Sequence, residues 1–285
     1  MGGEVNTRPI QEKRRKLKIT SKQKMLSRIC GAQLKRTAWS APRQAHLQCQ
    51  TIKRFSTAPI LCKQFKQSDQ PRLRINSVAP NFDADTTAGK INFYDYLGNS
   101  WGVLFSHPAD FTPVCTTEVS AFAKLKPEFD KRNVKLIGLS VEDVESHEKW
   151  IQDIKEVAKV KNVGFPIIGD TFRNVAFLYD MVDAEGFKNI NDGSLKTVRS
   201  VFVIDPKKKI RLIFTYPSTV GRNTSEVLRV IDALQLTDKE GVVTPINWQP
   251  SDDVIIPPSV SNDEAKAKFG DFNEIKPYLR FTKAK

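Results

Sequence analysis

The stretch that most constrains this chain is Ser106–Glu118, which reads SHPADFTPVCTTE and holds a single cysteine, Cys115. It follows Trp101–Phe105, an apolar run with the length and composition of a buried strand. After it, apolar residues recur every three or four positions, as on one face of a helix: Val119, Phe122, Leu125 and Phe129. The sequence therefore predicts a strand that ends shortly before Cys115 and a helix that begins close to it.

The predicted junction favours a reactive cysteine. Thr112 suits the N-cap of the helix, Pro113 its first position and Glu118 its opening turn. Free backbone N–H groups and the positive end of the helix dipole favour the thiolate, which is the nucleophilic form of cysteine. Position alone leaves an alternative of comparable weight, because a cysteine between Val and Thr is commonly a small buried hydrophobic residue.

The same stretch resembles a known signature. Pro108-x-x-x-Thr112-x-x-Cys115 is similar to the active-site motif of the peroxiredoxins (the AhpC/TSA superfamily), and the longer string resembles their 1-Cys branch. The resemblance implies a thioredoxin-like α/β fold with a mixed central sheet, flanking helices and a C-terminal arm. It also implies a thiol-dependent peroxidase that reduces hydrogen peroxide and organic hydroperoxides, while Cys115 cycles between thiolate and sulfenic acid.

Further site residues follow from the resemblance. Thr112 would place its hydroxyl near the reactive sulfur, and Arg199 lies in a segment that matches the arginine segment of the family. A guanidinium keeps its proton and stabilises a thiolate and a developing oxyanion. Pro108 would shield the thiol, with His107 and Arg222 as supporting residues. From the residues alone, Arg199 is also compatible with a solvated strand start, His107 with a packed neutral histidine, and Arg222 with the surface.

The fate of the sulfenic acid is constrained by the other cysteines, Cys30, Cys49 and Cys62, which all precede Cys115. Two-cysteine peroxiredoxins carry a second Cys before a Pro in the C-terminal arm, whereas the similar string here, Gly241–Pro245, has Thr. The resemblance thus implies reduction by an outside thiol (glutathione, glutaredoxin or thioredoxin) or by Cys62. An inert Cys62 is an equal alternative. The chain has no C-x-x-C and few histidines, so we expect neither a metal nor a cofactor.

Positive charge is concentrated at the N-terminus. Residues 1–75 hold 18 Lys and Arg against 3 Asp and Glu, and the remaining residues hold 27 against 29. An amphipathic, arginine-containing, acid-poor pattern begins at Met25. We therefore predict that 1–55 is a mitochondrial presequence cut after Phe55, with 1–24 upstream of a start at Met25, and that the mature protein is in the matrix. The alternative is a nucleic-acid-binding arm. No apolar run approaches the roughly 20 residues of a membrane helix.

The rest of the chain divides into a connector (56–73), a domain (74–236) and a proline-rich C-terminal arm (237–285). The predicted strands are 101–105, 134–139, 165–168, 200–204 and 210–216, and the predicted helices follow Cys115 and cover 144–160, 172–179 and 225–236. This order indicates an α/β sandwich around a mixed sheet. The resemblance implies a homodimer formed through the sheet edge, with the arms exchanged.

A second class of activity is suggested by Gly98–Gly102, which fits the G-x-S-x-G pattern of serine hydrolases at Ser100. Some 1-Cys peroxiredoxins are credited with phospholipase activity at a similar motif, supported by a His and an Asp. Here Tyr94 and Lys207 take those places, and the motif precedes a strand, so Ser100 fits a turn residue better. Redox relay or chaperone functions through protein partners stay open beside the peroxidase.

Overall fold

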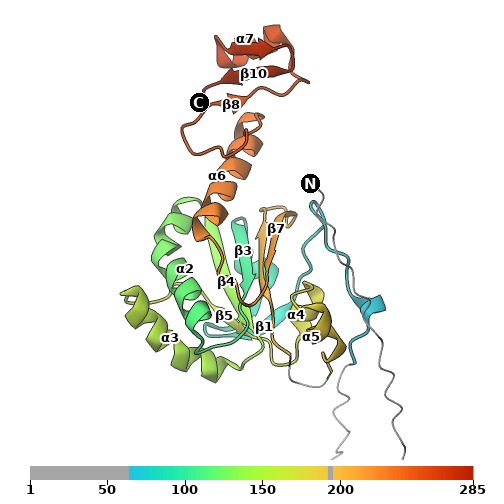
Figure 1. Ribbon diagram of the computed structural model, residues 1–285, viewed down its shortest axis with the longest axis vertical. Coiled ribbons are helices and arrows are strands. Elements are labelled where there is room, and N and C mark those ends of the chain that lie inside the picture. Colours follow the sequence, from blue (N-terminus) through green and yellow to red (C-terminus); the bar gives the residue numbers. More distant parts are fainter. Residues whose placement is uncertain (1–63, 192–194, 285) are drawn as a thin grey trace, which may run out of the picture. The chain divides into compact units, whose positions relative to one another are not determined.

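The computed structural model describes residues 64–191 and 195–284. The predicted presequence, the translation start proposed at Met25 and the candidate resolving residue Cys62 lie outside these ranges. Within them, no helix is both long enough and apolar enough to cross a lipid bilayer. The expected mixed sheet with flanking helices is present, and it carries the junction at Cys115 (Figure 1).

The central sheet has the strand order β2-β1-β5-β4-β3-β6-β7. β3 lies at its middle, parallel to β4 and antiparallel to β6, with Trp101 opposite Val134 and Gly102 opposite Ile204. Every residue of β3 and β6 is buried, as expected for uninterrupted apolar runs in a covered sheet. The strand bounds are β1 Asp83–Thr86, β2 Gly89–Asn92, β3 Trp101–Ser106, β4 Val134–Ser140, β5 Ile167–Gly169, β6 Arg199–Ile204 and β7 Ile210–Tyr216.

Helices cover both faces of this sheet. Figure 1 shows α2 and α3 on one side of it and α4 and α5 on the other. Successive residues of β3 alternate between two hydrophobic clusters, with Val103 and Phe105 facing α2 and α3, and Leu104 packed in the cluster that holds α4. The helix bounds are α1 Phe93–Leu97, α2 Pro113–Lys131, α3 Val144–Ala158, α4 Asn174–Leu178, α5 Ala184–Lys188, α6 Thr224–Glu240 and α7 Asn262–Phe269.

The start of α2 agrees with the sequence in position but not in every contact. Thr112 is the N-cap residue and Pro113 opens the helix, yet the Thr112 hydroxyl makes no cap hydrogen bond. Glu118 was expected in the opening turn, and this was wrong, since the first turn of α2 contains no acidic residue. Glu118 lies one turn further along and is buried. Its carboxylate is therefore free of a capping role.

The segment after α6 is more ordered than its sequence suggests. It forms a three-stranded sheet of order β8-β10-β9, from Val254–Ile255, Leu279–Thr282 and Asn273–Lys276. α7 begins with a capping box, in which Ser261 and Glu264 bind each other's backbone N–H. Arg280 is buried and donates to the carbonyls of Pro257 and Val260 and to the side-chain oxygen of Asn262.

Candidate active site

Cys115 lies in the first turn of α2, directly beyond the carboxyl end of β3, and its side chain is almost fully buried. The guanidinium of Arg199 faces it, with Nη1 3.4 Å from the cysteine Sγ. β6 begins at Arg199 and pairs with β3, so the sheet itself brings the arginine beside the residues that lead to the cysteine. A buried thiol therefore faces a buried cation.

Arg199 is held from two sides. Its Nε and Nη2 donate to the carbonyl oxygen of Ser218, at 3.1 and 2.7 Å. Its Nη1 donates to Oε2 of Glu118 at 2.6 Å while also facing Cys115. Side-chain and backbone acceptors thus fix the plane of the guanidinium, which leaves little rotational freedom relative to the sulfur.

Glu118 is shared between two arginines. Arg222 donates to it from its backbone N at 2.6 Å, from Nε at 3.0 Å and from Nη2 at 2.9 Å, in addition to the bond from Arg199. Burial alone would raise the pKa of Glu118, but the hydrogen bonds and charge of Arg222 and the charge of Arg199 outweigh it, so this pKa lies below its usual range. The carboxylate is therefore ionised at neutral pH.

Arg222 ties this ion cluster to the sheet. Its Nη1 donates to the carbonyl oxygens of Ser106 and Ser200, each at 2.9 Å, at the neighbouring ends of β3 and β6. The side chain is buried, which differs from the surface position that the residues alone allowed. The part played by Glu118 was missed in the sequence, where its position close to Cys115 in the helix was the available signal.

The loop that joins β3 to α2 positions the remaining predicted residues. Pro108 is buried in it, as is His107. The Thr112 hydroxyl donates to the carbonyl of Ala109 at 2.9 Å, a contact within the loop. Phe111, which directly precedes Thr112 in the loop, has φ 53° and a side chain that is 56% exposed. A bulky apolar residue is thus held in a left-handed conformation next to the site.

A second polar cluster adjoins this loop and combines His107, Asp110 and His147. The Asp110 carboxylate contacts His107 Nε2 at 2.9 Å through Oδ1, and His147 Nδ1 at 2.7 Å through Oδ2. Burial lowers the pKa of His107, partly offset by its bond to Asp110, and the pKa of Asp110 lies far below its usual range because bonds to the two histidines outweigh its burial. No pattern in the sequence predicted the pairing of His147 with this loop.

These three residues have the composition of a metal site. Their possible ligand atoms all lie within 4.8 Å of one another, which among the described residues makes them the candidate group for a metal ion. Two atoms bound to one zinc ion at about 2.0–2.2 Å would lie more than about 3 Å apart. Asp110 instead contacts each ring nitrogen directly at hydrogen-bond distance. As described, the cluster is a set of hydrogen bonds centred on the Asp110 carboxylate.

Ser100 does not have the surroundings of a hydrolase nucleophile. Its hydroxyl donates to the Asn133 side-chain oxygen at 2.7 Å, and its backbone N–H donates to Leu97. Among the described residues the histidines are His107 and His147, and both are engaged with Asp110. An amide oxygen cannot remove the serine proton as a base would. The contacts match those of a turn residue.

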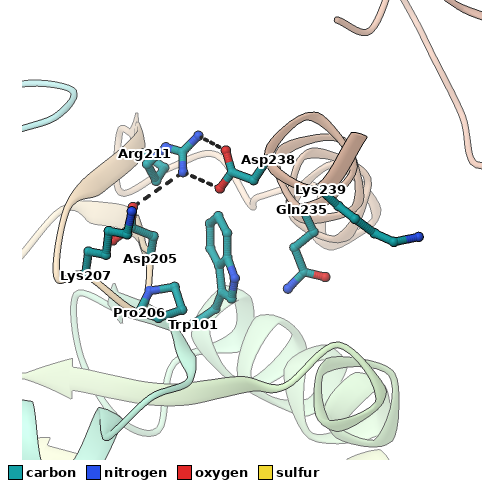
Figure 2. A pocket seen from close by; sticks show the side chains of 8 residues that line it. All are labelled: Trp101, Asp205, Pro206, Lys207, Arg211, Gln235, Asp238 and Lys239. Carbon is teal, nitrogen blue, oxygen red and sulfur yellow. Dashed lines mark hydrogen bonds and ion pairs between the residues drawn. The ribbon is translucent and has the colours of Figure 1, made fainter. Parts of the chain in front are cut away.

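A pocket of about 650 Å³ lies elsewhere on the domain (Figure 2). The Arg211 guanidinium sits 5.5 Å from the centre of the Trp101 ring and bonds both oxygens of Asp238, at 2.6 and 2.8 Å. It also reaches Asp205, so both carboxylates in the pocket are paired with the same arginine. The lining contains no cysteine, serine or histidine; it consists of Trp101, Asp205, Pro206, Lys207, Arg211, Gln235, Asp238 and Lys239.

Two family models match the chain. The AhpC/TSA family model covers residues 75–213, and the model for the C-terminal domain of 1-Cys peroxiredoxin covers 233–271. The mitochondrial peroxiredoxin PRX1 of Saccharomyces cerevisiae is 94% identical over 261 residues, which is 92% of this chain and all of that protein. 1-Cys peroxiredoxin A of rice is 48% identical, over 75% of this chain and 99% of the relative.

Solved structures agree with these matches. The yeast mitochondrial 1-Cys peroxiredoxin, described for its thiol resolving mechanism via glutathione/thioredoxin systems, has a TM-score of 0.69 at 97% identity, covering 74% of this chain and all of that one. A cysteine-to-serine variant of peroxiredoxin 6 from Arenicola marina has a TM-score of 0.71 at 47% identity, covering 75% and 99%. The thioredoxin-like fold that the sequence led us to expect is thereby confirmed.

Proposed function

The chain belongs to the 1-Cys peroxiredoxins, and from this premise we propose that Cys115 is the nucleophile of its thiol-dependent peroxidase activity. The observation that carries the proposal is the contact of the Cys115 sulfur with Arg199, whose guanidinium is anchored by Glu118. The protein is mitochondrial, like the yeast relative that it matches at 94% identity.

The chemistry assigned to the site is a displacement at a peroxide oxygen. The Cys115 thiolate attacks one oxygen of ROOH, the O–O bond breaks, and the other oxygen leaves as an alkoxide that takes up a proton to give ROH. The cysteine becomes a sulfenic acid. Arg199 stabilises the thiolate before attack and the negative charge that develops on the leaving oxygen.

The other predicted residues support this step. Thr112 and Pro108 shape the loop beside the sulfur, and their proposed contribution is to hold peroxide in line and to exclude water. Arg222 acts through Glu118, because its bonds fix the carboxylate that anchors Arg199. His107 is proposed as a neutral packing residue of the loop, in keeping with its burial and lowered pKa.

An outside thiol completes the cycle. Every other cysteine precedes Cys115 in the sequence. The C-terminal string that resembles the resolving segment of two-cysteine peroxiredoxins therefore has no cysteine here. We propose that glutathione or a thioredoxin-type protein attacks the sulfenic sulfur, releases water and leaves a disulfide that a second thiol opens. Cys62 is the alternative attacking thiol within the chain. Both routes are electron-balanced, since each consumes two thiols for each peroxide.

A homodimer is proposed as the assembled form, as the resemblance implies. Its support is a group of exposed large apolar side chains in the part of the chain after α6: Val243, Ile246, Ile275 and Tyr278. Several exposed apolar residues on one short segment are typical of a surface that another protein covers. Sedimentation of the purified protein tests this assembly, and a monomer at micromolar concentration would contradict it.

The decisive experiment measures oxidation by hydrogen peroxide in rapid mixing, followed by turnover with glutathione and with thioredoxin. We expect Cys115→Ser to lose all turnover. Arg199→Ala should react at least about 100-fold more slowly, as expected for removal of a buried group that stabilises developing charge. Arg229→Ala is the matched control, because that arginine bonds Glu226 and the Trp248 carbonyl rather than Cys115 or its partners. Turnover by Cys115→Ser would refute the proposal.

The same protein shows which thiol attacks the sulfenic acid of Cys115. Mass spectrometry after one equivalent of peroxide is expected to find either a glutathione adduct on Cys115 or a Cys62–Cys115 disulfide. A disulfide that disappears in Cys62→Ser assigns the resolving role to Cys62. Unchanged turnover by Cys62→Ser, with only glutathione adducts on Cys115, assigns it to the outside thiol.

A further inference from the structure

The buried cluster next to the active-site loop contains a histidine whose two ring nitrogens both face acceptors. His147 Nδ1 lies 2.7 Å from Oδ2 of Asp110, and Nε2 lies 3.0 Å from the carbonyl oxygen of Ile168 in β5. A carbonyl oxygen only accepts hydrogen bonds, so Nε2 must carry a proton. An ionised carboxylate also only accepts, so Nδ1 must carry one as well.

The protonation state of His147 therefore depends on whether Asp110 is ionised. The pKa of Asp110 lies far below its usual range, and its Oδ2 also accepts a hydrogen bond from the Ser146 hydroxyl at 2.8 Å. Among the described residues its hydrogen bonds come from His107, Ser146 and His147. A carboxylate with three donors around it is ionised at neutral pH.

The proton positions on the two histidines of the cluster follow from these contacts. His107 donates through Nε2 to Asp110, whereas its Nδ1 is buried with no partner in the part of the chain that the structure describes, which fits a neutral ring. Glu142 also faces this region and adds negative charge. His147 is fully buried, and as an imidazolium it supplies the counter-charge that a buried carboxylate needs.

We propose that His147 is an imidazolium that positions the active-site loop through Asp110. The role rests on the peroxidase function proposed for Cys115. α3 contacts the active-site segment at two points on one of its faces. His147 holds Asp110 in the loop, and one turn later the Trp150 indole N–H donates to the Thr116 hydroxyl beside Cys115, at 3.1 Å. The charge on His147 fixes the first of these points.

Nitrogen NMR of the isotope-labelled full chain tests the charge directly. The sequence has three histidines, so the signals of His147 can be assigned with a single variant. We expect both ring nitrogens of His147 to carry protons at neutral pH, because each of them faces an acceptor. A bare ring nitrogen on His147 at neutral pH would overturn the proposal. The spectrum is recorded on Cys115→Ser as well, so its outcome is independent of peroxidase activity.

The positioning role is tested by removing the charge while keeping a polar side chain. His147→Gln is expected to slow the oxidation of Cys115 by about tenfold to a hundredfold, because a shift of the loop misaligns the sulfur. Its rate should also gain a pH-dependent step that the unsubstituted protein lacks, as the cluster takes up a proton to replace the lost charge.

Ser146→Ala is the matched control, since Ser146 bonds the same Asp110 oxygen without carrying charge. It should react within about twofold of the unsubstituted protein, because both histidines still hold the Asp110 carboxylate. Equal rates and equal pH profiles for His147→Gln and Ser146→Ala would refute the positioning role. Circular dichroism shows whether His147→Gln is folded, and if it is not, the NMR result on the unsubstituted protein decides.

Discussion

Replacing Glu118 by Gln should destabilise the protein more than the same kind of substitution at an exposed carboxylate. The change is nearly isosteric, but it removes the one negative charge between the buried guanidinium groups of Arg199 and Arg222. Glu118 accepts four hydrogen bonds, two at each oxygen. Gln keeps one oxygen, and its NH2 group would face donors at the other position.

The size of the loss follows from these contacts. Two charge-assisted hydrogen bonds disappear, at about 1.5–3 kcal/mol each. Removing one partner of a buried ion pair costs about 3–5 kcal/mol, because the remaining charge is left uncompensated. We therefore expect the free energy of unfolding of Glu118→Gln to fall by about 3–5 kcal/mol at neutral pH.

The pH dependence has a defined sign. The folded-state pKa of Glu118 is lowered, so its stabilisation is complete above the unfolded pKa of about 4.3 and is lost as the pH falls toward the folded value. The difference between Glu118→Gln and the unsubstituted protein should therefore shrink as the pH falls below about 4.3.

Urea unfolding followed by circular dichroism measures both effects. Glu145→Gln is the control, since Glu145 pairs with Lys149 on the exposed side of α3 and its loss should change stability little. A loss for Glu118→Gln no larger than about 1 kcal/mol, the range of exposed pairs, would show that the ion cluster does not behave as a buried one. A difference that grows toward acid pH would contradict the sign.

Two further predictions concern the elements around the site. Gly169→Ala should lower the free energy of unfolding by about 1–3 kcal/mol in the same urea assay, because the new Cβ would meet the backbone nitrogen of Val144 at 2.9 Å, where α3 begins; an unchanged stability would mean that the start of α3 moves freely. Burial raises the pKa of Asp170 to about 6, so ionisation of this carboxylate opposes folding above the unfolded pKa, and Asp170→Asn should flatten the pH dependence of stability up to about pH 6. An identical pH profile for the two proteins would argue against a raised pKa.

The sequence predicted the parts of the fold that depend on apolar patterns. The strands that became β3, β4, β6 and β7 were located to within a residue or two, since each is a short run rich in apolar residues. α3 ends two residues before its predicted end because Lys159 adopts a left-handed conformation, and α6 runs four residues beyond its prediction to a glycine cap at Gly241. These ends depend on backbone conformation rather than on periodicity.

Polar segments were not predictable in the same way. β1 and β2 have the sequences DADT and GKIN, and Thr86 is the one buried residue of the pair, so no apolar alternation marks them. The connector was similarly featureless, yet the Phe65 ring in it packs against Phe177 in a tilted arrangement, with 4.7 Å between ring centres. Such contacts join residues far apart in the chain, and periodicity carries no information on them.

The residues of the candidate site also differ in how far the sequence predicted them. The position of Cys115 in α2 follows from local sequence, and Arg199 followed from resemblance to a family. The sharing of Glu118 by two arginines and the pairing of His147 with Asp110 each join segments separated by dozens of residues. Only the folded sheet and helices bring these groups together.

The small sheet after α6 also bears on how the protein is made. Its central strand, β10, is later in the chain than both of its neighbours, and β8 and β9 pair with β10 rather than with each other. A ribosome releases the larger domain first, and domains generally fold in that order. Before β10 has emerged, β8 can form its bridge between Ile255 and Val243, but β9 must wait for β10. This segment is therefore the last part of the described chain to close, and an arrest of translation before Leu279 would leave β9 without its partner strand.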